Sequence, residues 1–193
     1  MPNHATHQSG SRRLRALLKC LVLLLSLAGQ ARAVESSVTK EHQLKAAFIY
    51  NFTKFVEWPA TNFPDTHSPI IIGVVGKGPL CAELERAVKD RKVNGRELVV
   101  RIVENPEAAK SVHLLFFCAS EDARLGEFLK ASAGGNILTV GESEKFSQSG
   151  GAINFLVEGD KIRFDIDMIA AEKAGLKVSA QLQKLARTVR TTK

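Results

Sequence analysis

The sequence predicts one α/β domain: a layered fold with a mainly parallel sheet, helices on both faces and an antiparallel hairpin near the C-terminus. Two runs of strand length, residues 69–76 and 112–118, are almost continuously apolar, as expected for strands covered on both faces. Helical segments recur between the strands, an order typical of a parallel sheet. Gly159–Asp160 separates two alternating segments and predicts the hairpin turn.

A helix is predicted at the start of this domain, over residues 40–57. Its apolar and aromatic side chains recur at three- and four-residue spacing, which places them on one face. Trp58–Pro59 ends the helix, because the residue before a proline is disfavoured in the helical region. The side chains expected on the buried face are Leu44, Ala47, Phe48, Asn51, Phe52 and Phe55.

Strands and helices alternate in the segments that follow. Asn94–Gly95 and Gly134–Gly135 mark turns or breaks between them, and Ser120 is a predicted N-cap. The predicted strands span residues 69–76, 97–103, 112–118, 136–140, 152–158 and 161–167. The predicted helices span residues 79–90, 106–110, 120–132 and 168–175, and a last helical segment spans 176–189.

The first 33 residues have the features of a cleavable secretory signal peptide. A basic start is followed by an apolar run over residues 20–28, well short of the roughly 20 residues that span a bilayer. Ala31 and Ala33 give the small-x-small pattern of a signal peptidase site, which predicts cleavage between Ala33 and Val34. We therefore expect the mature protein outside the cytoplasm.

Removal of residues 1–33 changes the charge of the chain. The full sequence has 27 Lys and Arg and 20 Asp and Glu, a net charge of +7. Five of the basic residues and none of the acidic ones lie in this segment, so the mature chain has a net charge of +2. Proteins that bind nucleic acid generally carry a basic patch or stripe, so we expect no nucleic-acid partner. Residues 34–40 are expected to be a flexible mature N-terminus, and residues 41–189 to form one domain.

Neither a cofactor nor a metal is predicted. Gly76–Gly78 lies between a strand and a helix, as a dinucleotide-binding loop would, but Cys81 stands where the fingerprint needs Gly or Ala. Asp165 and Asp167 share one face of a strand, yet no third oxygen ligand is close in sequence. Their alternation with apolar neighbours is typical of an ordinary half-exposed strand.

The sequence also lacks a catalytic motif. The three histidines that follow residue 33 are not near another His or Cys at metal-ligand spacing. Gly141–Ser143 lacks the closing glycine of a serine nucleophile elbow. We therefore predict that the protein is not an enzyme.

Cys81 and Cys118 are the two cysteines that remain after residue 33. In an oxidising compartment such a pair is a disulfide candidate. Cys81 lies in the first turn after one predicted strand and Cys118 at the end of another. If those strands are parallel neighbours, both cysteines meet at the same edge of the sheet. Two buried free thiols are the alternative.

Seven segments of the chain, taken in order, resemble the YfiR-like family. Each segment is short, but the ordered set covers residues 41–189. At Asp167 the chain departs from the family pattern, which usually has asparagine there, and we expect an altered local hydrogen bond. The matching segments are NFTKFVEWP (51–59), GVVG (73–76), ILTVGE (137–142), GGAINF (150–155), IRFDID (162–167), GLKVS (175–179) and LAR (185–187).

The resemblance implies a periplasmic repressor. Relatives in this family bind the periplasmic part of an inner-membrane diguanylate cyclase and hold it inactive. An OmpA-like outer-membrane lipoprotein can draw the repressor away, which raises cyclic di-GMP and favours biofilm. Such a switch needs differential binding to two partners and no chemistry of its own. A homodimer is also open.

The alternative is a periplasmic small-molecule-binding sensor. The ends of the strands in an open sheet form natural crevices, here near Gly76, Cys118 and Gly141.

Trp58 and Phe63 are the candidate partner-binding residues. They belong to the segment that follows the first predicted helix, and aromatic side chains on such a loop often anchor protein interfaces. The simpler interpretation is that Trp58 packs the end of the helix onto the core.

Overall fold

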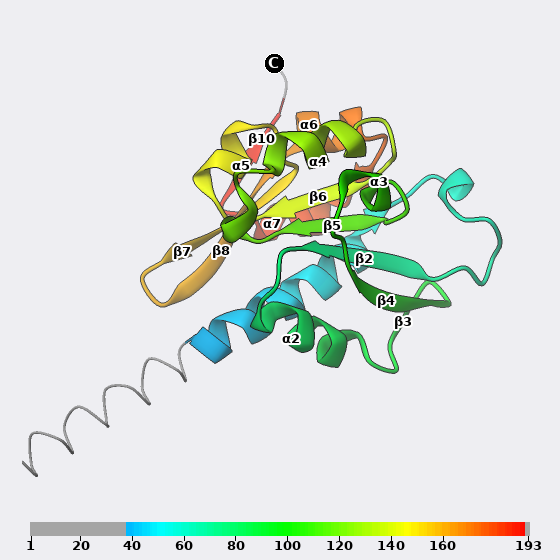
Figure 1. Ribbon diagram of the computed structural model, residues 1–193, viewed down its shortest axis with the longest axis horizontal. Coiled ribbons are helices and arrows are strands. Elements are labelled where there is room, and N and C mark those ends of the chain that lie inside the picture. The colour runs from blue at the N-terminus through cyan, green and yellow to red at the C-terminus, as the bar shows by residue number, and fades with distance from the viewer. Residues whose placement is uncertain (1–37, 192–193) are drawn as a thin grey trace, which may run out of the picture. The chain divides into compact units, whose positions relative to one another are not determined.

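The computed structural model describes residues 38–191 (Figure 1). The chain from Glu41 onward forms one compact unit. Residues 38–55 are helical. Within the described part of the chain, no helix combines the length and the apolar character needed to cross a membrane.

The centre of the domain is an eight-stranded, mostly parallel sheet with the strand order β10-β8-β7-β6-β5-β2-β4-β3. β4, β2, β5, β6 and β7 run parallel to one another, whereas β8 turns back on β7 as the predicted antiparallel hairpin. The predicted fold class is therefore confirmed. The strands are β2 (Ile70–Val75), β3 (Lys92–Val93), β4 (Arg96–Ile102), β5 (Leu114–Phe117), β6 (Leu138–Gly141), β7 (Ile153–Glu158), β8 (Lys161–Asp167) and β10 (Thr188–Arg190).

Helices cover both faces of the sheet. Figure 1 shows the helix over residues 38–55 and α2 on one side, and α4 and α5 on the other. The sequence of β5 is continuously apolar because both faces of this strand are buried. Leu114 and Phe116 pack into one core cluster, and Leu115 and Phe117 pack into the other. The helices are α2 (Pro79–Val88), α3 (Pro106–Ala109), α4 (Leu125–Ser132), α5 (Glu144–Gln148), α6 (Met168–Lys173) and α7 (Ala180–Leu185), with 3-10 turns η1 (Ala60–Asn62) and η2 (Ala119–Glu121).

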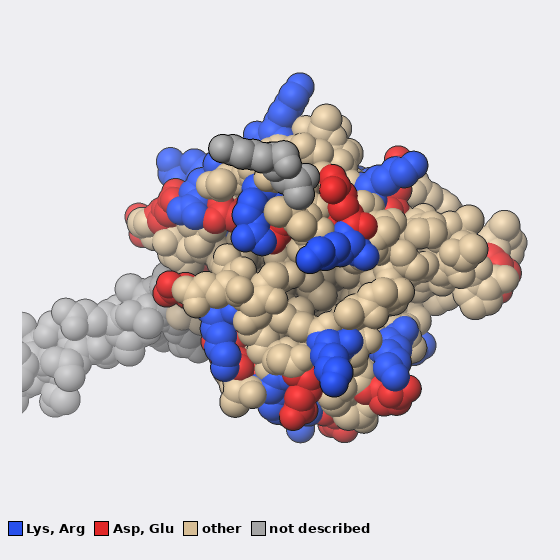
Figure 2. All heavy atoms as spheres, turned by 90° about the horizontal axis from the view of Figure 1, so that it is seen from above, with Lys and Arg blue, Asp and Glu red and all other residues tan. Residues whose placement is uncertain are grey.

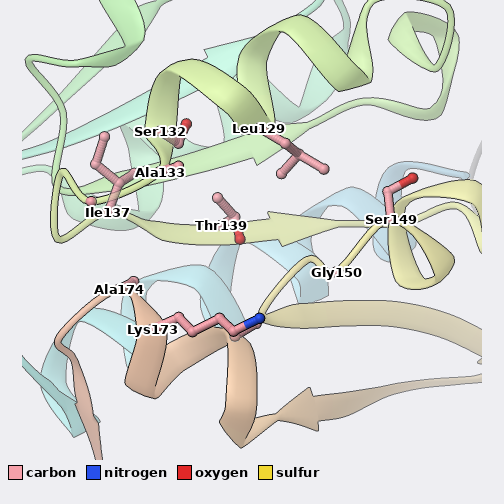
Figure 3. A pocket seen from close by; sticks show the side chains of 11 residues that line it. Leu129, Ser132, Ala133, Ile137, Thr139, Ser149, Gly150, Lys173 and Ala174 are labelled. Atoms are coloured by element: carbon pink, nitrogen blue, oxygen red, sulfur yellow. The ribbon is translucent and has the colours of Figure 1, made fainter.

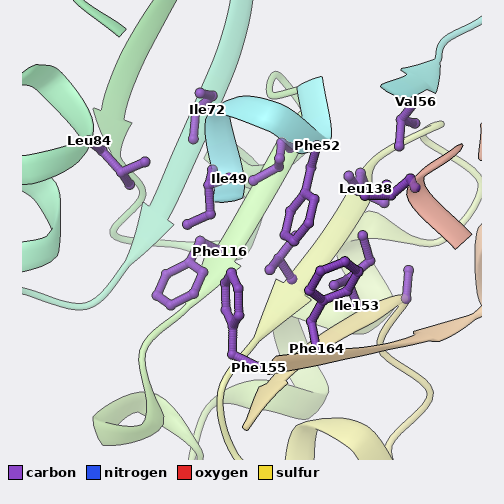
Figure 4. Packing of buried hydrophobic residues seen from close by; sticks show 14 of the residues in the cluster. Ile49, Phe52, Val56, Ile72, Leu84, Phe116, Leu138, Ile153, Phe155 and Phe164 are labelled. Carbon is purple, nitrogen blue, oxygen red and sulfur yellow. The ribbon is translucent and has the colours of Figure 1, made fainter. Parts of the chain in front are cut away.

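Aromatic rings join the N-terminal helix to the hairpin. The ring of Phe52 lies 5.6 Å from that of Phe155 on β7 and 5.1 Å from that of Phe164 on β8, between centroids. Figure 4 shows these side chains pointing toward one another between the helix and the sheet. A short ladder between β1 (Val56–Glu57) and β9 (Lys177–Val178) fixes the end of the helix to the C-terminal region.

The N-terminal helix buries a face rotated from the predicted one. Phe52 is buried as predicted, but Leu44 is 46% exposed and Ala47 is exposed. Ile49 and Lys45 are buried instead. The lysine can be buried because two carboxylates neutralise it, and apolar periodicity does not reveal such a pairing.

The predicted helix over residues 120–132 is wrong at its start. Ser120 lies in η2 and does not cap a helix, and α4 begins at Leu125. Asp122 is instead held by Ser143, whose hydroxyl donates a 2.7 Å hydrogen bond to its carboxylate. Ser143 caps α5, a helix that the sequence analysis did not predict.

The predicted helical segment over residues 176–189 is also wrong in part. It contains β9, the short helix α7 and the edge strand β10. Thr188–Arg190 pairs in parallel with Asp165–Asp167 of β8, so the hairpin extends the sheet and gives this segment a strand to pair with.

Phe146 of α5 occupies a slot that only glycines leave open. A Cβ atom at Gly141 would lie 2.2 Å from its ring, and one at Gly151 would lie 1.9 Å away. Both glycines belong to segments that carry the family resemblance. Their lack of a side chain is what lets Phe146 close this end of the core.

Asp167, the departure from the family pattern, caps α6. Its Oδ1 accepts hydrogen bonds from the backbone N–H groups of Ile169 (3.0 Å) and Ala170 (3.2 Å). The same carboxylate pairs with the guanidinium of Arg190 on β10. An asparagine could cap the helix but would lack this charge pairing, so the altered local hydrogen bond stays a prediction.

Candidate partner-binding site

Trp58 and Phe63 meet at one histidine. The indole Nε1–H of Trp58 donates a 3.0 Å hydrogen bond to the backbone oxygen of His113. The ring of Phe63 stacks on the imidazole, with centroids 4.6 Å apart and planes 13° apart. Arg96 also contacts Phe63, because its guanidinium carbon lies 3.8 Å from the ring centroid. The structure thus brings together the two predicted aromatic residues.

Backbone groups hold the guanidinium of Arg96 in place. Its Nη1 donates to the carbonyl oxygens of Asp65 (2.8 Å) and Ser68 (2.7 Å). The carboxylate of Asp65 accepts the backbone N–H groups of His67 and Ser68, both at 2.7 Å. These hydrogen bonds, that of His67 first, lower the pKa of Asp65. The loop that follows Phe63 is therefore tied down before any partner arrives.

His113 is neutral, and its ring is held by contacts within the fold. Its Nδ1 accepts a 3.0 Å hydrogen bond from the backbone N–H of Ile71. Burial is the main cause that lowers the pKa of His113; the backbone at Asn62 raises it, and repulsion by Arg96 lowers it. A neutral ring matches the acceptor role of Nδ1. His113 therefore supports the aromatic residues and is not available as a metal ligand or a base.

A cavity of about 270 Å³ opens beside these aromatic residues. Trp58 is half-buried, so it both packs the end of the helix and forms part of the cavity wall. Apolar walls with one carboxylate, one amide and one guanidinium suit a side chain or small group of mixed character. The lining residues are Thr53, Val56, Glu57, Trp58, Phe63, Ile70, Asn94 and Arg96.

Cys81 and Cys118 lie at the carboxyl edge of the sheet. Cys118 follows β5, the parallel neighbour of β2, and Cys81 lies in the first turn of α2. Both are half-buried free thiols that pack against the same core cluster. Burial raises the pKa of Cys118 to about 12, and the nearby charges of Glu142 and Cys81 add to this. The arrangement brings the two cysteines together, and the disulfide stays a prediction.

The crevice predicted near Gly76 is present. A cavity of about 340 Å³ lies beside Gly76 and Lys77, with Arg124 and Glu104 on its wall. At Gly141 the ring of Phe146 occupies the space in which a Cβ atom would lie, so a core side chain covers that glycine.

Asp165 and Asp167 do not come together around a shared ligand. Asp165 binds Arg187 through two hydrogen bonds of 2.9 and 2.5 Å, and Asp167 serves the cap described above. Across residues 38–191, no three His, Cys, Asp or Glu side chains gather as a metal site would require. The predicted cleavage point between Ala33 and Val34 lies outside the described residues.

Sequence reasoning missed three features of these sites. Arg96 gave no signal, because its contacts are carbonyl oxygens and a ring that are distant in sequence. The stacking of His113 on Phe63 was not predicted, because the two rings are distant in sequence. The ion pair between Lys45 and Glu142 joins residues 97 positions apart.

Charged side chains are mixed over the surface. On the face seen in Figure 2, Lys and Arg alternate with Asp and Glu, and no continuous basic patch is visible. This distribution agrees with the small net charge expected of the mature chain.

Comparison with solved structures shows a likeness of fold. The crystal structure of a conserved domain protein from Vibrio cholerae O1 biovar El Tor is 13% identical, with a TM-score of 0.50, and covers 63% of this chain and 55% of that chain. The ABC domain in complex with L-Trp from Streptococcus pneumoniae is 10% identical, with a TM-score of 0.47, and covers 62% and 55%. This chain thus spans about half the length of the solved chains that it matches.

The family comparison is far more specific. A model of the YfiR/HmsC-like family matches residues 42–187, which includes the aromatic pair, both cysteines and the hairpin. The match covers nearly all of the described domain, in agreement with the segments singled out in the sequence. The chain belongs to the YfiR/HmsC-like family.

Proposed function

We propose that this protein is a periplasmic repressor that binds the periplasmic domain of an inner-membrane diguanylate cyclase and holds the enzyme inactive. The YfiR-like family is a regulatory, non-catalytic family of the periplasm, which supports the general role. The cleavable signal peptide over residues 1–33 delivers the protein to that compartment. Release by an OmpA-like outer-membrane lipoprotein, as the family resemblance implies, restores cyclase activity.

The observation that carries a docking role is the cavity beside Trp58 and Phe63. Interfaces draw most of their affinity from a few aromatic or arginine side chains in preformed pockets. Here Phe63 is fixed between Arg96 and His113, so little conformational entropy is lost when a partner binds.

The charge of Arg96 indicates which side chains of a partner would fit the cavity. Arg96 makes hydrogen bonds to carbonyl oxygens, and no carboxylate pairs with it among residues 38–191. We therefore expect an apolar anchor from the cyclase to enter the cavity with an acidic neighbour that faces Arg96.

Capture of the cyclase from its own cell envelope tests the proposal. Tagged mature protein is expected to retain a membrane protein with a cytoplasmic cyclase domain. Phe63→Ala should lose this protein and should fail to lower cyclic di-GMP in cells that lack the chromosomal copy. The matched control is Val157→Ala on the hairpin, since Val157 is 56% exposed and does not line the cavity. Equal capture by both variants would contradict the assigned site, and capture of no cyclase would contradict the repressor role.

Cys81 and Cys118 are proposed to form a disulfide in the mature protein. Exposure to an oxidising compartment, their shared sheet edge and their shared core cluster support the bond. It would fasten α2 to the end of β5 and so stiffen the carboxyl edge of the sheet.

A further inference from the structure

A groove between α4 and α6 has no role in the proposed contact with the cyclase. It holds a cavity of about 250 Å³, and Figure 3 shows its wall-forming side chains on the two helices with Thr139 of β6 at the floor. Its lining is aliphatic or small, and no aromatic ring contributes. The lining residues are Leu129, Ser132, Ala133, Gly134, Ile137, Thr139, Ser149, Gly150, Ala170, Lys173 and Ala174.

Lys173 is the single charged residue of this lining. Among residues 38–191 its ammonium has neither an ion-pair nor a hydrogen-bond partner, although seven of the other basic residues are paired with carboxylates. Figure 3 shows the side chain extended along the groove. The groove thus presents an unneutralised positive charge at one end of an apolar surface.

Thr139 adds a hydrogen-bond donor to the floor. The residue is 8% exposed, and its Oγ1 accepts a 3.1 Å hydrogen bond from the backbone N–H of Ala152. The hydroxyl hydrogen has no acceptor among the described residues, and Figure 3 shows the hydroxyl on the side of the groove that faces Lys173. A buried donor without an acceptor favours an anionic or carbonyl ligand.

We propose that this groove binds a short aliphatic monocarboxylate, with the carboxylate at Lys173 and Thr139 and the hydrocarbon chain between α4 and α6. The cavity is smaller than the roughly 300 Å³ at which drug-sized pockets begin, so the ligand is small. Aliphatic walls without a ring favour a linear chain over an aromatic one. One cation selects a single negative charge, and no acidic side chain lines the groove to repel it.

Binding to the groove and simple ion pairing at Lys173 predict different dependences on chain length. Burial of each methylene is worth about 0.8 kcal/mol, which is a factor of about four in affinity. Hexanoate is therefore expected to bind roughly 15-fold more tightly than butanoate if its two additional methylenes are buried. If the acids only formed a solvent-exposed ion pair with Lys173, butanoate and hexanoate would bind with the same affinity.

Titration of the purified mature protein with hexanoate, followed by NMR chemical shifts, tests the proposal. We expect one saturable site, with shifts at α4, α6 and Thr139, and weaker binding of both butanoate and uncharged hexanol. Lys173→Gln should weaken hexanoate at least fivefold without affecting hexanol, and Lys173→Arg should restore most of the affinity. Ala170→Leu, which fills the groove, should weaken hexanoate and hexanol alike.

Lys177→Gln is the matched control, because Lys177 is an exposed lysine on β9 that does not line the groove. Equal affinities of butanoate and hexanoate, or unchanged hexanoate binding in Lys173→Gln and Ala170→Leu, would overturn the assignment. So would the absence of shifts at millimolar hexanoate. The test uses the protein alone, so its outcome is independent of whether a cyclase is the partner.

Discussion

Replacement of Lys45 by methionine tests whether a buried ion pair fastens the N-terminal helix to the sheet. Lys45 Nζ lies 2.7 Å from Glu142 Oε2 and 2.5 Å from Glu41 Oε1, and the lysine side chain is only 7% exposed. Methionine keeps the apolar stem and removes the charge. The variant therefore separates the ion pair from the packing of the side chain.

The expected cost follows from the burial of the partners. At an effective dielectric constant of about 20, two charges 2.7 Å apart attract by roughly 6 kcal/mol, much of which desolvation cancels. Removal of one partner of a buried pair costs about 3–5 kcal/mol, because the other charge is left uncompensated. Glu142 keeps 20% exposure and a 3.1 Å hydrogen bond from the N–H of Ala119. We therefore expect Lys45→Met to lower the free energy of unfolding by about 2–3 kcal/mol.

Urea denaturation at pH 7 measures this cost, with Glu41→Gln as the control. Glu41 is 35% exposed and pairs with Lys45 within one helix, so its loss should cost no more than about 0.5 kcal/mol. In Lys45→Met/Glu142→Gln the uncompensated carboxylate is gone, and a substantial part of the stability should return. A cost below about 0.5 kcal/mol for Lys45→Met, or equal costs for the two single variants, would refute the reasoning.

The pH dependence gives a second check on the same pair. Burial lowers the pKa of Lys45, but the hydrogen bonds that its ammonium donates to Glu142 and Glu41 outweigh this effect, so the pKa is raised above its ordinary value of 10.5. A raised pKa in the folded state means that the stabilisation is fully present below about pH 10.4 and is lost as the pH rises through the folded-state pKa. The difference between wild type and Lys45→Met should therefore stay constant from pH 7 to about 10 and shrink above it.

Four further outcomes are expected. Denatured, unreduced mature protein should contain no thiol that can be labelled, and two labelled thiols would exclude the Cys81–Cys118 bond. The bond closes a loop of 118 − 81 = 37 residues, so its reduction should lower the free energy of unfolding by about 3–4 kcal/mol. In reduced protein, the pKa of Cys118 near 12 should make its alkylation at pH 8 far slower than that of an exposed cysteine. Urea denaturation should show that Phe146→Ala lowers the free energy of unfolding by about 3–5 kcal/mol. By the same assay, Gly151→Ala should lower it by at least about 1–3 kcal/mol, because the added Cβ would overlap the Phe146 ring. Mass spectrometry of the periplasmic fraction should find a chain that starts at Val34 or within a residue or two of it, and an intact Met1 would contradict export by cleavage.

The sheet could be predicted from sequence because its elements carry strong local signals. Strands such as β2 and β5 are apolar on both faces, and Asn94–Gly95 and Gly159–Asp160 mark tight turns. The order of the strands was not predicted, because β2 lies between β4 and β5 and position along the chain does not give this order. The edge strand β10 has no such signal, because its three residues are exposed or half-buried and depend on β8 for pairing.

The buried face of the N-terminal helix shows what periodicity leaves out. A stripe of apolar residues can be drawn through Leu44 and Phe48, but the observed face runs through Lys45 and Ile49. Lys45 can lie on the buried face because Glu142, 97 residues away, and Glu41 neutralise its charge. A pairing over that distance in sequence cannot be read from local spacing.

The candidate partner-binding site could be predicted only in part, because some of its contacts join residues that are distant in sequence. Trp58 and Phe63 were identified because aromatic residues on a loop have a local signature. Arg96 and His113, which hold Phe63 from both sides, reach it from other strands. Arg96 is the first residue of β4 and His113 directly precedes β5, so both contacts of Phe63 depend on the assembly of the sheet.

Asn136 connects the two proposed sites through hydrogen bonds. Its side-chain Nδ2 donates a 2.8 Å bond to the carbonyl oxygen of Ala174, which lines the groove between α4 and α6. Its own carbonyl accepts a 3.3 Å bond from Asn62, which lies between Trp58 and Phe63 in the chain. These two hydrogen bonds would carry a shift of the end of α6 to the segment that holds both aromatic residues. Because linkage is reciprocal, any factor by which a bound carboxylate changes the affinity for the cyclase would equal the factor by which the cyclase changes the affinity of the groove for the carboxylate.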